Sequence, residues 1–331
     1  MESYQSDWDE TFQYLSREML VPEVLETDLQ QQVPTPPASE ISPSLRKDTT
    51  TLSVSTTFFP GADLGQPHPP DLVLHSSDSV FFYIHSSAFL KFSKNPFTSL
   101  IPAYPISPTS DDSILPEVIV PENSHVLNIV LHLLYMIPCT HFSPPADVIS
   151  KAIGALKRYG VSIKPFAAPD TCLYDLILSR APLHPIELYA LAAEHDLHDL
   201  AVAISSHLMS FNLSTLTDEI AIQIGPTYLK SLFFLHLGRN EALKRLLFTP
   251  PTLHGPTLQC DFAEQKKLTR AWALAAAYLA WDARPDLSTG TINSVFGSLQ
   301  KHLCCQLCQN NLRQRVKQII VEWSDVKVSH Y

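Results

Sequence analysis

Three residues near the C-terminus have the types and the spacing of half a metal site. His302, Cys305 and Cys308 follow one another at three-residue steps, and Cys260 lies upstream of them. Zinc prefers four sulfur or imidazole-nitrogen ligands arranged as a tetrahedron, and Cys-x-x-Cys is a common half-site. The sequence therefore offers a structural zinc site built from Cys260, His302, Cys305 and Cys308, although only one such half-site is present.

The same cysteines fit a structural alternative. Apolar residues or cysteines recur at three- and four-residue steps, which predicts the buried stripe of one long helix: Cys305, Cys308, Leu312, Val316, Ile319 and Trp323. In such a stripe a free cysteine behaves as a small apolar residue. We take this stripe as the default, which needs no cofactor, and keep structural zinc as the alternative.

A second polar group consists of His195, Asp196, His198 and Asp199. Paired His-Asp residues bind metal ions in some phosphohydrolases. Such enzymes need a further upstream His and a downstream Asp as metal ligands on helices, and we find no convincing set of these ligands in the sequence. The group lies between two predicted helices, where polar residues and caps are expected. A metal-dependent hydrolase is therefore the least favoured alternative, and we expect no enzyme.

Composition argues against two further classes of function, phosphate-loop enzymes and nucleic-acid-binding proteins. The 331 residues include 27 Pro but only 9 Gly, and neither G-x-G-x-x-G nor G-x-x-x-x-G-K-[ST] occurs, which argues against phosphate-loop enzymes. The net charge is -10, and the basic residues at Lys266–Arg270 and Arg313–Lys317 fit solvated helix faces, so we expect no direct nucleic-acid contact.

Membrane insertion and secretion are not expected either. The longest apolar run, Ala271–Trp281, has eleven residues, whereas a span needs about 18 or more. The first residues, MESYQSDWDE, lack the basic-then-apolar order of a secretory signal. We expect an intracellular protein, in the cytoplasm, the nucleus or both, with reduced cysteines.

The acidity is concentrated in residues 1–70, which carry 3 Lys or Arg against 11 Asp or Glu, with 9 Pro and 16 Ser or Thr. Such a composition predicts a disordered tail, with folded structure starting near Pro70–Asp71. Within it, apolar residues at helical spacing (Trp8, Phe12, Leu15 and Met19) lie among acidic ones. They fit either a docking or activation helix or a transient helix in a solvated tail.

Residues 71–210 predict a mixed block of strands and helices. Asp71–His75 and Val80–Ile84 form a hairpin pattern around Ser76–Ser79, and Glu117–Val120 is a third strand. Helices are predicted at Ser86 to about Leu100, from Asn123 or Ser124 to Tyr135, and at Asp147–Tyr159, Pro185–His195 and Leu197–His207. Ile163–Pro182 is a long insert in this order.

This block resembles a BTB/POZ domain, in its residues as well as its order of elements. The likeness rests on the Asp-led strand at Asp71–Leu74, the strand ending in His85, Phe89-Leu90 with Ser93 and Phe97, Val118–Glu122 and Leu133-Leu134-Tyr135. The spacing after Ser93, Met136-Ile-Pro after Tyr135, and the Pro-rich segment before the third strand depart from the family. The insert and the C-terminal third look like BTB proteins of mushroom-forming (basidiomycete) fungi, with matches at Tyr228–Leu232, Leu235–Arg239, Ala271–Leu274, Trp281–Pro285 and Cys305-x-x-Cys308.

The resemblance implies an α+β BTB/POZ fold, with a small sheet flanked by helices, and a protein that binds a second copy of itself or other proteins. Carried over from the family, the interface residues would be Leu72, Leu74, His85, Phe89, Phe92 and Phe97. The alternative is that Leu72 and Phe89 fill the monomer's own core, and we place it first for both. Asp71 near His85 would be a polar contact at the dimer seam or a capping or core pair, and we favour the second.

Residues 211–325 predict an all-helical domain, followed by a short tail at 326–331. The expected helices are Thr217–Gly225, Tyr228–Leu237, Glu241–Phe248, Glu264–Trp281, Ile292–Leu303 and Asn311–Trp323. Because Ala271–Trp281 is apolar around its whole circumference, we expect that helix to be buried on all sides, with Trp281→Ala costing ~3–5 kcal/mol.

The function expected from these features is non-catalytic: self-association and recruitment of partners as an adaptor or scaffold, in one variant for cullin-type ubiquitin ligases. A transcriptional regulator acting through partner proteins is the alternative, suggested by the acidic aromatic tail. The expected partners are a second copy and other proteins, without nucleic acid or membrane.

Overall fold

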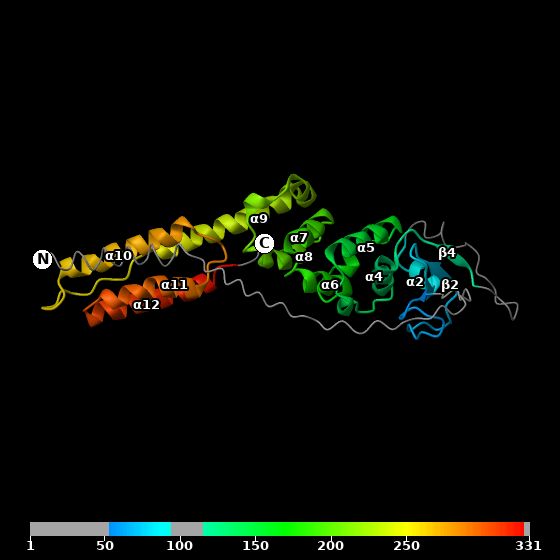
Figure 1. The fold of residues 1–331 in the computed structure, drawn as a ribbon, viewed down its shortest axis with the longest axis horizontal. Helices are drawn as coiled ribbons and strands as arrows, with labels where there is room; N and C mark the ends of the chain where they lie inside the picture. The colour runs from blue at the N-terminus through cyan, green and yellow to red at the C-terminus, as the bar shows by residue number, and fades with distance from the viewer. Residues whose placement is uncertain (1–52, 94–114, 328–331) are drawn as a thin grey trace, which may run out of the picture. The chain divides into compact units, whose positions relative to one another are not determined.

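The computed structural model describes residues 53–93 and 115–327. They all belong to one compact unit. Most of the expected acidic tail, its apolar positions Trp8 to Met19 and also Phe97 lie outside the described residues. Figure 1 shows the arrangement of the helices and strands.

A four-stranded sheet lies at the start of the described chain, with strand order β1-β3-β2-β4. The predicted hairpin is present as β2 (Leu72–His75) and β3 (Val80–Ile84), paired antiparallel with Leu74 opposite Phe82. The predicted third strand is β4 (Glu117–Ile119), parallel to β2. The alternation of apolar residues in the hairpin buries Leu72, Leu74, Phe82 and Ile84 on the core side.

Folded structure begins earlier than the composition predicts. Strand β1 (Ser53–Val54) pairs parallel with β3, and Phe58 has no exposed surface. The Phe58 ring contacts the rings of His132 and Tyr135. The boundary at residue 70 is therefore too late, because one aromatic side chain in a polar, Pro-rich segment completes the core beside the sheet.

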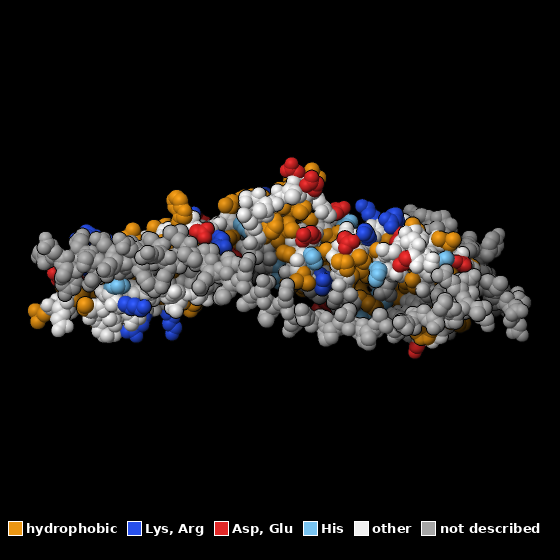
Figure 2. All heavy atoms as spheres, in the orientation of Figure 1, with side chains coloured by type: hydrophobic (Ala, Val, Ile, Leu, Met, Phe, Trp, Pro, Cys, Tyr) orange, Lys and Arg blue, Asp and Glu red, His pale blue; other side chains and the backbone are white. Residues whose placement is uncertain are grey.

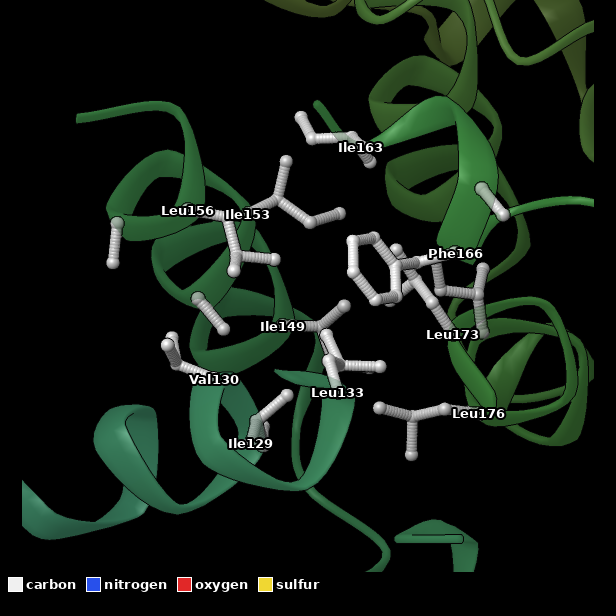
Figure 3. Packing of buried hydrophobic residues seen from close by; sticks show 14 of the residues in the cluster. Ile129, Val130, Leu133, Ile149, Ile153, Leu156, Ile163, Phe166, Leu173 and Leu176 are labelled. Carbon is white, nitrogen blue, oxygen red and sulfur yellow. The ribbon is translucent and has the colours of Figure 1, made fainter. Parts of the chain in front are cut away.

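Helices cover the sheet and extend the core. They are α2 (Ser86–Leu90), α4 (Ser124–Leu134) and α5 (Ala146–Arg158). The side chain of Asn123 caps α4 by accepting from the Val126 N–H, and Asp78 accepts from the Ser124 N–H at 2.7 Å. The expected insert contains a further helix, α6 (Cys172–Arg180), after the 3₁₀ turn Lys164–Phe166. Figure 3 shows Phe166 between Ile149 and Ile153 of α5 and Leu173 of α6.

The chain on either side of residue 210 packs into one buried cluster. Helices α7 (Pro185–Glu194) and α8 (His198–Ser205) are followed by α9 (Asp218–Leu247), whose Leu232 is part of the same buried cluster as Leu188 of α7. The Tyr189 hydroxyl donates to the Tyr228 carbonyl at 2.9 Å. The predicted helices Tyr228–Leu237 and Glu241–Phe248 are thus one. The predicted end of the helix before them is confirmed, because Gly225 has non-helical angles (φ 71°, ψ 165°) just before Pro226 and separates two helical segments of α9.

The C-terminal part consists of α9, α10 (Phe262–Trp281), α11 (Thr289–Ser298) and α12 (Gln306–Ser324). Arg239 of α9 is buried and donates to the carbonyls of Pro285, Val326 and Lys327, and its guanidinium lies 4.1 Å from the Trp323 ring centre. These contacts hold the helix continuous through Gly238-Arg239-Asn240, where the sequence suggests a break.

The expectation that α10 is buried on all sides is wrong. Trp272 is 1% exposed and stacks on Phe296, whereas Trp281 is 93% exposed. Positions nine residues apart lie on nearly opposite sides of an α-helix. The two rings therefore point in opposite directions, and only the Trp272 ring packs against the other helices. None of the helices in the described part combines the length and the apolar composition that a bilayer span requires.

Candidate metal centre

Four side chains from two distant segments converge at one end of the helical part. His254 and Cys260 lie in the loop between α9 and α10, and Cys305 and Cys308 lie at the start of α12. Their ligand atoms all lie within 4.8 Å of one another. This is the group of His, Cys, Asp and Glu side chains that the described residues bring together as a possible metal site.

The elements on either side determine where the four ligands lie. Cys260 ends a tight turn in which Thr257 and Cys260 exchange two backbone hydrogen bonds of 2.9 and 3.2 Å. The next residue, Asp261, caps α10 by accepting from the Glu264 N–H. Cys305 is the N-cap of α12 and Cys308 lies in its first turn, so the Cys-x-x-Cys spacing brings both sulfur atoms to the same end of the helix.

The distance between Cys260 and Cys308 matches that of two sulfur ligands on a tetrahedral ion. Cys260 Sγ lies 3.7 Å from Cys308 Sγ, and two thiolates at ~2.3 Å from a tetrahedral zinc ion would be about 3.8 Å apart. His254 Nε2 lies 3.2 Å from Cys308 Sγ and 3.4 Å from Cys305 Sγ. The donor set, three cysteines and one histidine, therefore fits a cation placed between them.

The orientation of His254 also suits a ligand. Its Nδ1 lies 2.6 Å from the Gly255 carbonyl oxygen, so Nδ1 carries the proton and donates it there. That hydrogen bond leaves the lone pair of Nε2 directed at the sulfur atoms. A histidine ligand usually has its second nitrogen held in this way.

The three thiols differ in acidity for physical reasons. Backbone N–H groups of Cys308 and Leu307 at the start of α12 point to Cys305 Sγ and lower the pKa of its thiol to about 7. Burial raises the pKa of the Cys308 thiol to about 12, and burial also raises that of Cys260. Three thiolates this close repel one another, and a divalent cation would compensate that charge.

One expected ligand is wrong. His302 is not a member of the group, because it ends the 3₁₀ turn Leu299–His302, after which Leu303 is extended and the chain changes direction before α12. The histidine that takes part is His254. The signal for it is a second half-site, His254-x₅-Cys260, in a Pro- and Gly-containing loop, which Cys260 alone does not reveal.

The structural alternative for the cysteines is confirmed in part. Cys308 lies on a buried stripe of α12 with Leu312, Val316, Ile319 and Trp323. Cys305 lies before the helix and is half-buried, and Cys304 is exposed outside the group. Cys308 therefore belongs to the stripe and to the ligand group at the same time, so its place in the stripe does not decide against a metal.

The residues expected at a dimer interface are placed inside the described part of the chain. Leu72, Leu74 and Phe89 are fully buried in the chain's own core, and Phe92 is half-buried. Leu72, Leu74 and Phe89 thus have little surface left for a partner, in line with the alternative that we placed first for Leu72 and Phe89. An interface role for Phe92 stays a prediction.

His85 is buried and satisfied rather than free at a seam. Its Nδ1 lies 2.9 Å from the Tyr135 hydroxyl and its Nε2 lies 2.8 Å from the His68 carbonyl oxygen. Asp71 instead accepts from the N–H and hydroxyl of Ser86, so it caps α2.

The His195–Asp199 group has structural contacts. His195 is the C-cap of α7 and His198 is the first residue of α8, as their place between two helices predicts. Asp196 accepts from Lys164 Nζ at 2.9 Å and from the Tyr228 hydroxyl at 3.0 Å. These contacts tie the joint between α7 and α8 to neighbouring segments.

No family model, no curated protein and no solved structure matches the chain.

Proposed function

We propose that the protein is a non-catalytic interaction protein whose C-terminal helices are held together by a structural zinc ion. The observation that carries the zinc proposal is the convergence of His254, Cys260, Cys305 and Cys308 within 4.8 Å. Three thiolates and one imidazole favour zinc over the harder cations. Four protein ligands fill a tetrahedral ion and leave no open position for a substrate, which is typical of structural rather than catalytic zinc.

The ion would join the loop between α9 and α10 to the start of α12. Hydrogen bonds from α12 already reach this loop and the end of α9. Asn311 donates to the Thr252 carbonyl at 2.8 Å, and Arg315 donates to the carbonyls of Leu246 and Thr249. A bound zinc ion would add a strong link across 48 residues of sequence, because it binds the folded arrangement and not the unfolded chain.

The test is the metal content of the purified full chain, measured by mass spectrometry of the elements. We expect one zinc ion per chain. Cys260→Ser and Cys305→Ser should lose it, whereas Cys304→Ser, a matched change at an exposed neighbouring cysteine, should keep it. Cobalt substitution should give the absorption bands of a tetrahedral thiolate site. Zinc-free protein that refuses added zinc or cobalt, or a Cys304→Ser variant as deficient as the other two, would contradict the proposal.

Self-association of the sheet-bearing part is the second element of the proposal, and an exposed edge supports it. Strand β4 lies at an edge of the sheet, and its Ile119 is 73% exposed. An exposed apolar side chain on a strand at the edge of a sheet is a site for another strand or another copy. A BTB-like domain would use such self-association to recruit partners as an adaptor, for cullin-type ubiquitin ligases or in transcription.

Light scattering of the full chain tests self-association. We expect a mass above 37.0 kDa that falls in Ile119→Lys and stays unchanged in Ile222→Lys, an exposed apolar position on α9. A strictly monomeric wild type would contradict this part. Affinity purification with mass spectrometry would then separate a ligase adaptor from a transcriptional regulator by the partners recovered.

A further inference from the structure

Four exposed apolar side chains lie within two residues of the metal-type ligands in the sequence. They are Leu253, Leu258, Phe262 and Leu307, of which Leu258 is the most exposed, at 108% of its reference area. Solvent-exposed apolar residues are normal when scattered singly, but a group of them at one place indicates a binding surface.

These four residues are expected to lie near one another, because the ligands that they neighbour in the sequence converge in the structure. Leu253 directly precedes His254, Leu258 and Phe262 lie two residues before and after Cys260, and Leu307 lies between Cys305 and Cys308. The four ligand atoms converge within 4.8 Å, so the neighbouring residues are carried around the same centre. We call Leu253, Leu258, Phe262 and Leu307 the apolar rim. In Figure 2 a hydrophobic side chain protrudes at the end where Figure 1 places the loop between α9 and α10.

The charge around the apolar rim is positive. Residues 239–327 carry twelve Lys or Arg against seven Asp or Glu, a net charge of +5 in a chain whose net charge is -10. Two of the acidic residues, Asp261 and Glu264, flank Phe262, and Glu264 is paired with Lys267 at 2.7 Å. Lys266 and Arg270 are exposed and follow Phe262 at four-residue steps, so they lie behind it on the same face of α10. In Figure 2 further basic side chains lie over α12.

We infer that the apolar rim and the basic face behind it bind an acidic peptide segment of a partner protein that also carries apolar side chains. The apolar side chains of the segment would cover the rim, and its carboxylates would lie against Lys266 and Arg270. A second copy fits less well, because a two-fold contact would bring two positive surfaces together. This inference rests on the proposed metal centre, since the ion would fix the loop that carries Leu253 and Leu258.

The test uses the full chain and a fluorescent amphipathic peptide built from Glu, Leu and Phe. The control peptide has Lys in place of each Glu. We expect the acidic peptide to bind and the basic peptide not to bind, with affinity falling as salt is raised. Leu258→Ser and the double variant Lys266→Glu with Arg270→Glu should each weaken binding about tenfold. Leu183→Ser, at an exposed leucine between α6 and α7, should leave it unchanged.

Several outcomes would overturn the inference. Equal binding of both peptides would show that charge plays no part. Preferential binding to vesicles of phosphatidylserine and phosphatidylcholine would show a lipid surface instead, and self-association abolished by Leu258→Ser would show a second copy. Zinc is measured in every sample, so that zinc-loaded protein without peptide binding refutes this inference alone. Peptide binding by a chain that takes up no zinc supports the surface and refutes the metal centre.

Discussion

Two tryptophans on one helix allow the same substitution to be made at a buried and at an exposed position. Trp272 and Trp281 both belong to α10, but only the first is buried. We expect Trp272→Ala to lower the free energy of unfolding by ~3–5 kcal/mol and Trp281→Ala to change it by less than about 0.5 kcal/mol. The second variant therefore controls for loss of a tryptophan from this helix.

The contacts of Trp272 account for the size of the effect. Its ring is stacked on Phe296 at 3.9 Å between ring centres, an aromatic pair of about 0.5–1.5 kcal/mol. Its indole N–H donates to the Leu247 carbonyl at 2.9 Å, a hydrogen bond worth about 1 kcal/mol. Loss of buried surface and the cavity left behind account for the rest. Trp272→Phe keeps most of the ring contact and loses the hydrogen bond, so it should cost about 1–2 kcal/mol.

The assay is urea unfolding of the full chain, followed by far-ultraviolet circular dichroism so that the signal does not depend on tryptophan. All variants are compared with zinc present, because metal loss would itself lower stability. The reasoning would be refuted by equal losses at the two positions, or by a Trp281→Ala variant that is the less stable of the pair.

Two further predictions use other buried groups. Burial lowers the pKa values of His132, His195 and His236 below the ordinary value near 6.5. Just below pH 6.5 the unfolded chain therefore binds protons that the folded chain does not. The free energy of unfolding should fall as the pH drops from about 6.5 through the folded-state pKa values. Urea midpoints at several pH values check this, and a His132→Leu variant with an unchanged pH dependence would exclude His132 as a contributor. Glu122→Ala should lower the free energy of unfolding by about 2–3 kcal/mol, because the buried carboxylate accepts from Arg158 Nη2 at 2.6 Å and from the Tyr159 hydroxyl. Lys151→Ala, which breaks the exposed ion pair with Asp147, should lower it by less than about 0.5 kcal/mol. Equal losses of the two variants in urea unfolding would contradict this difference between a buried and an exposed ion pair.

Local sequence pattern was sufficient for most elements of the sheet-bearing part. The hairpin and the helices α4, α5 and α7 lie within a few residues of their predicted bounds, because period-two and helical patterns are strong there. Helix α6 was missed because its segment was interpreted as an insert. Phe58 was missed because long-range packing, which composition does not contain, decides its burial.

The candidate metal centre shows the limit of spacing arguments. Cys260, Cys305 and Cys308 were predicted from residue type and from one half-site, whereas His254 replaces His302. A histidine three residues from a cysteine is close to it when a helix or a tight turn joins the two, whereas here the chain is extended at Leu303. The orientation of Trp281 has a similar origin: an all-apolar helix predicts burial on every side, but the number of neighbouring helices is a property of the whole fold.

The contacts of Arg239 have a consequence for the order in which the protein is made. Its guanidinium is satisfied by carbonyls at Val326 and Lys327, 87 and 88 residues later in the chain. During synthesis α9 emerges long before these acceptors exist, so Arg239 must stay hydrated and the C-terminal helices cannot close around it early. His254 and Cys260 are likewise synthesised before Cys305 and Cys308, so the ligand group forms only after the start of α12 has emerged. A ribosome that stalls within α12 would therefore hold a nascent chain with uncovered apolar helix faces and an unligated Cys260 thiol, features that chaperones and thiol oxidants recognise.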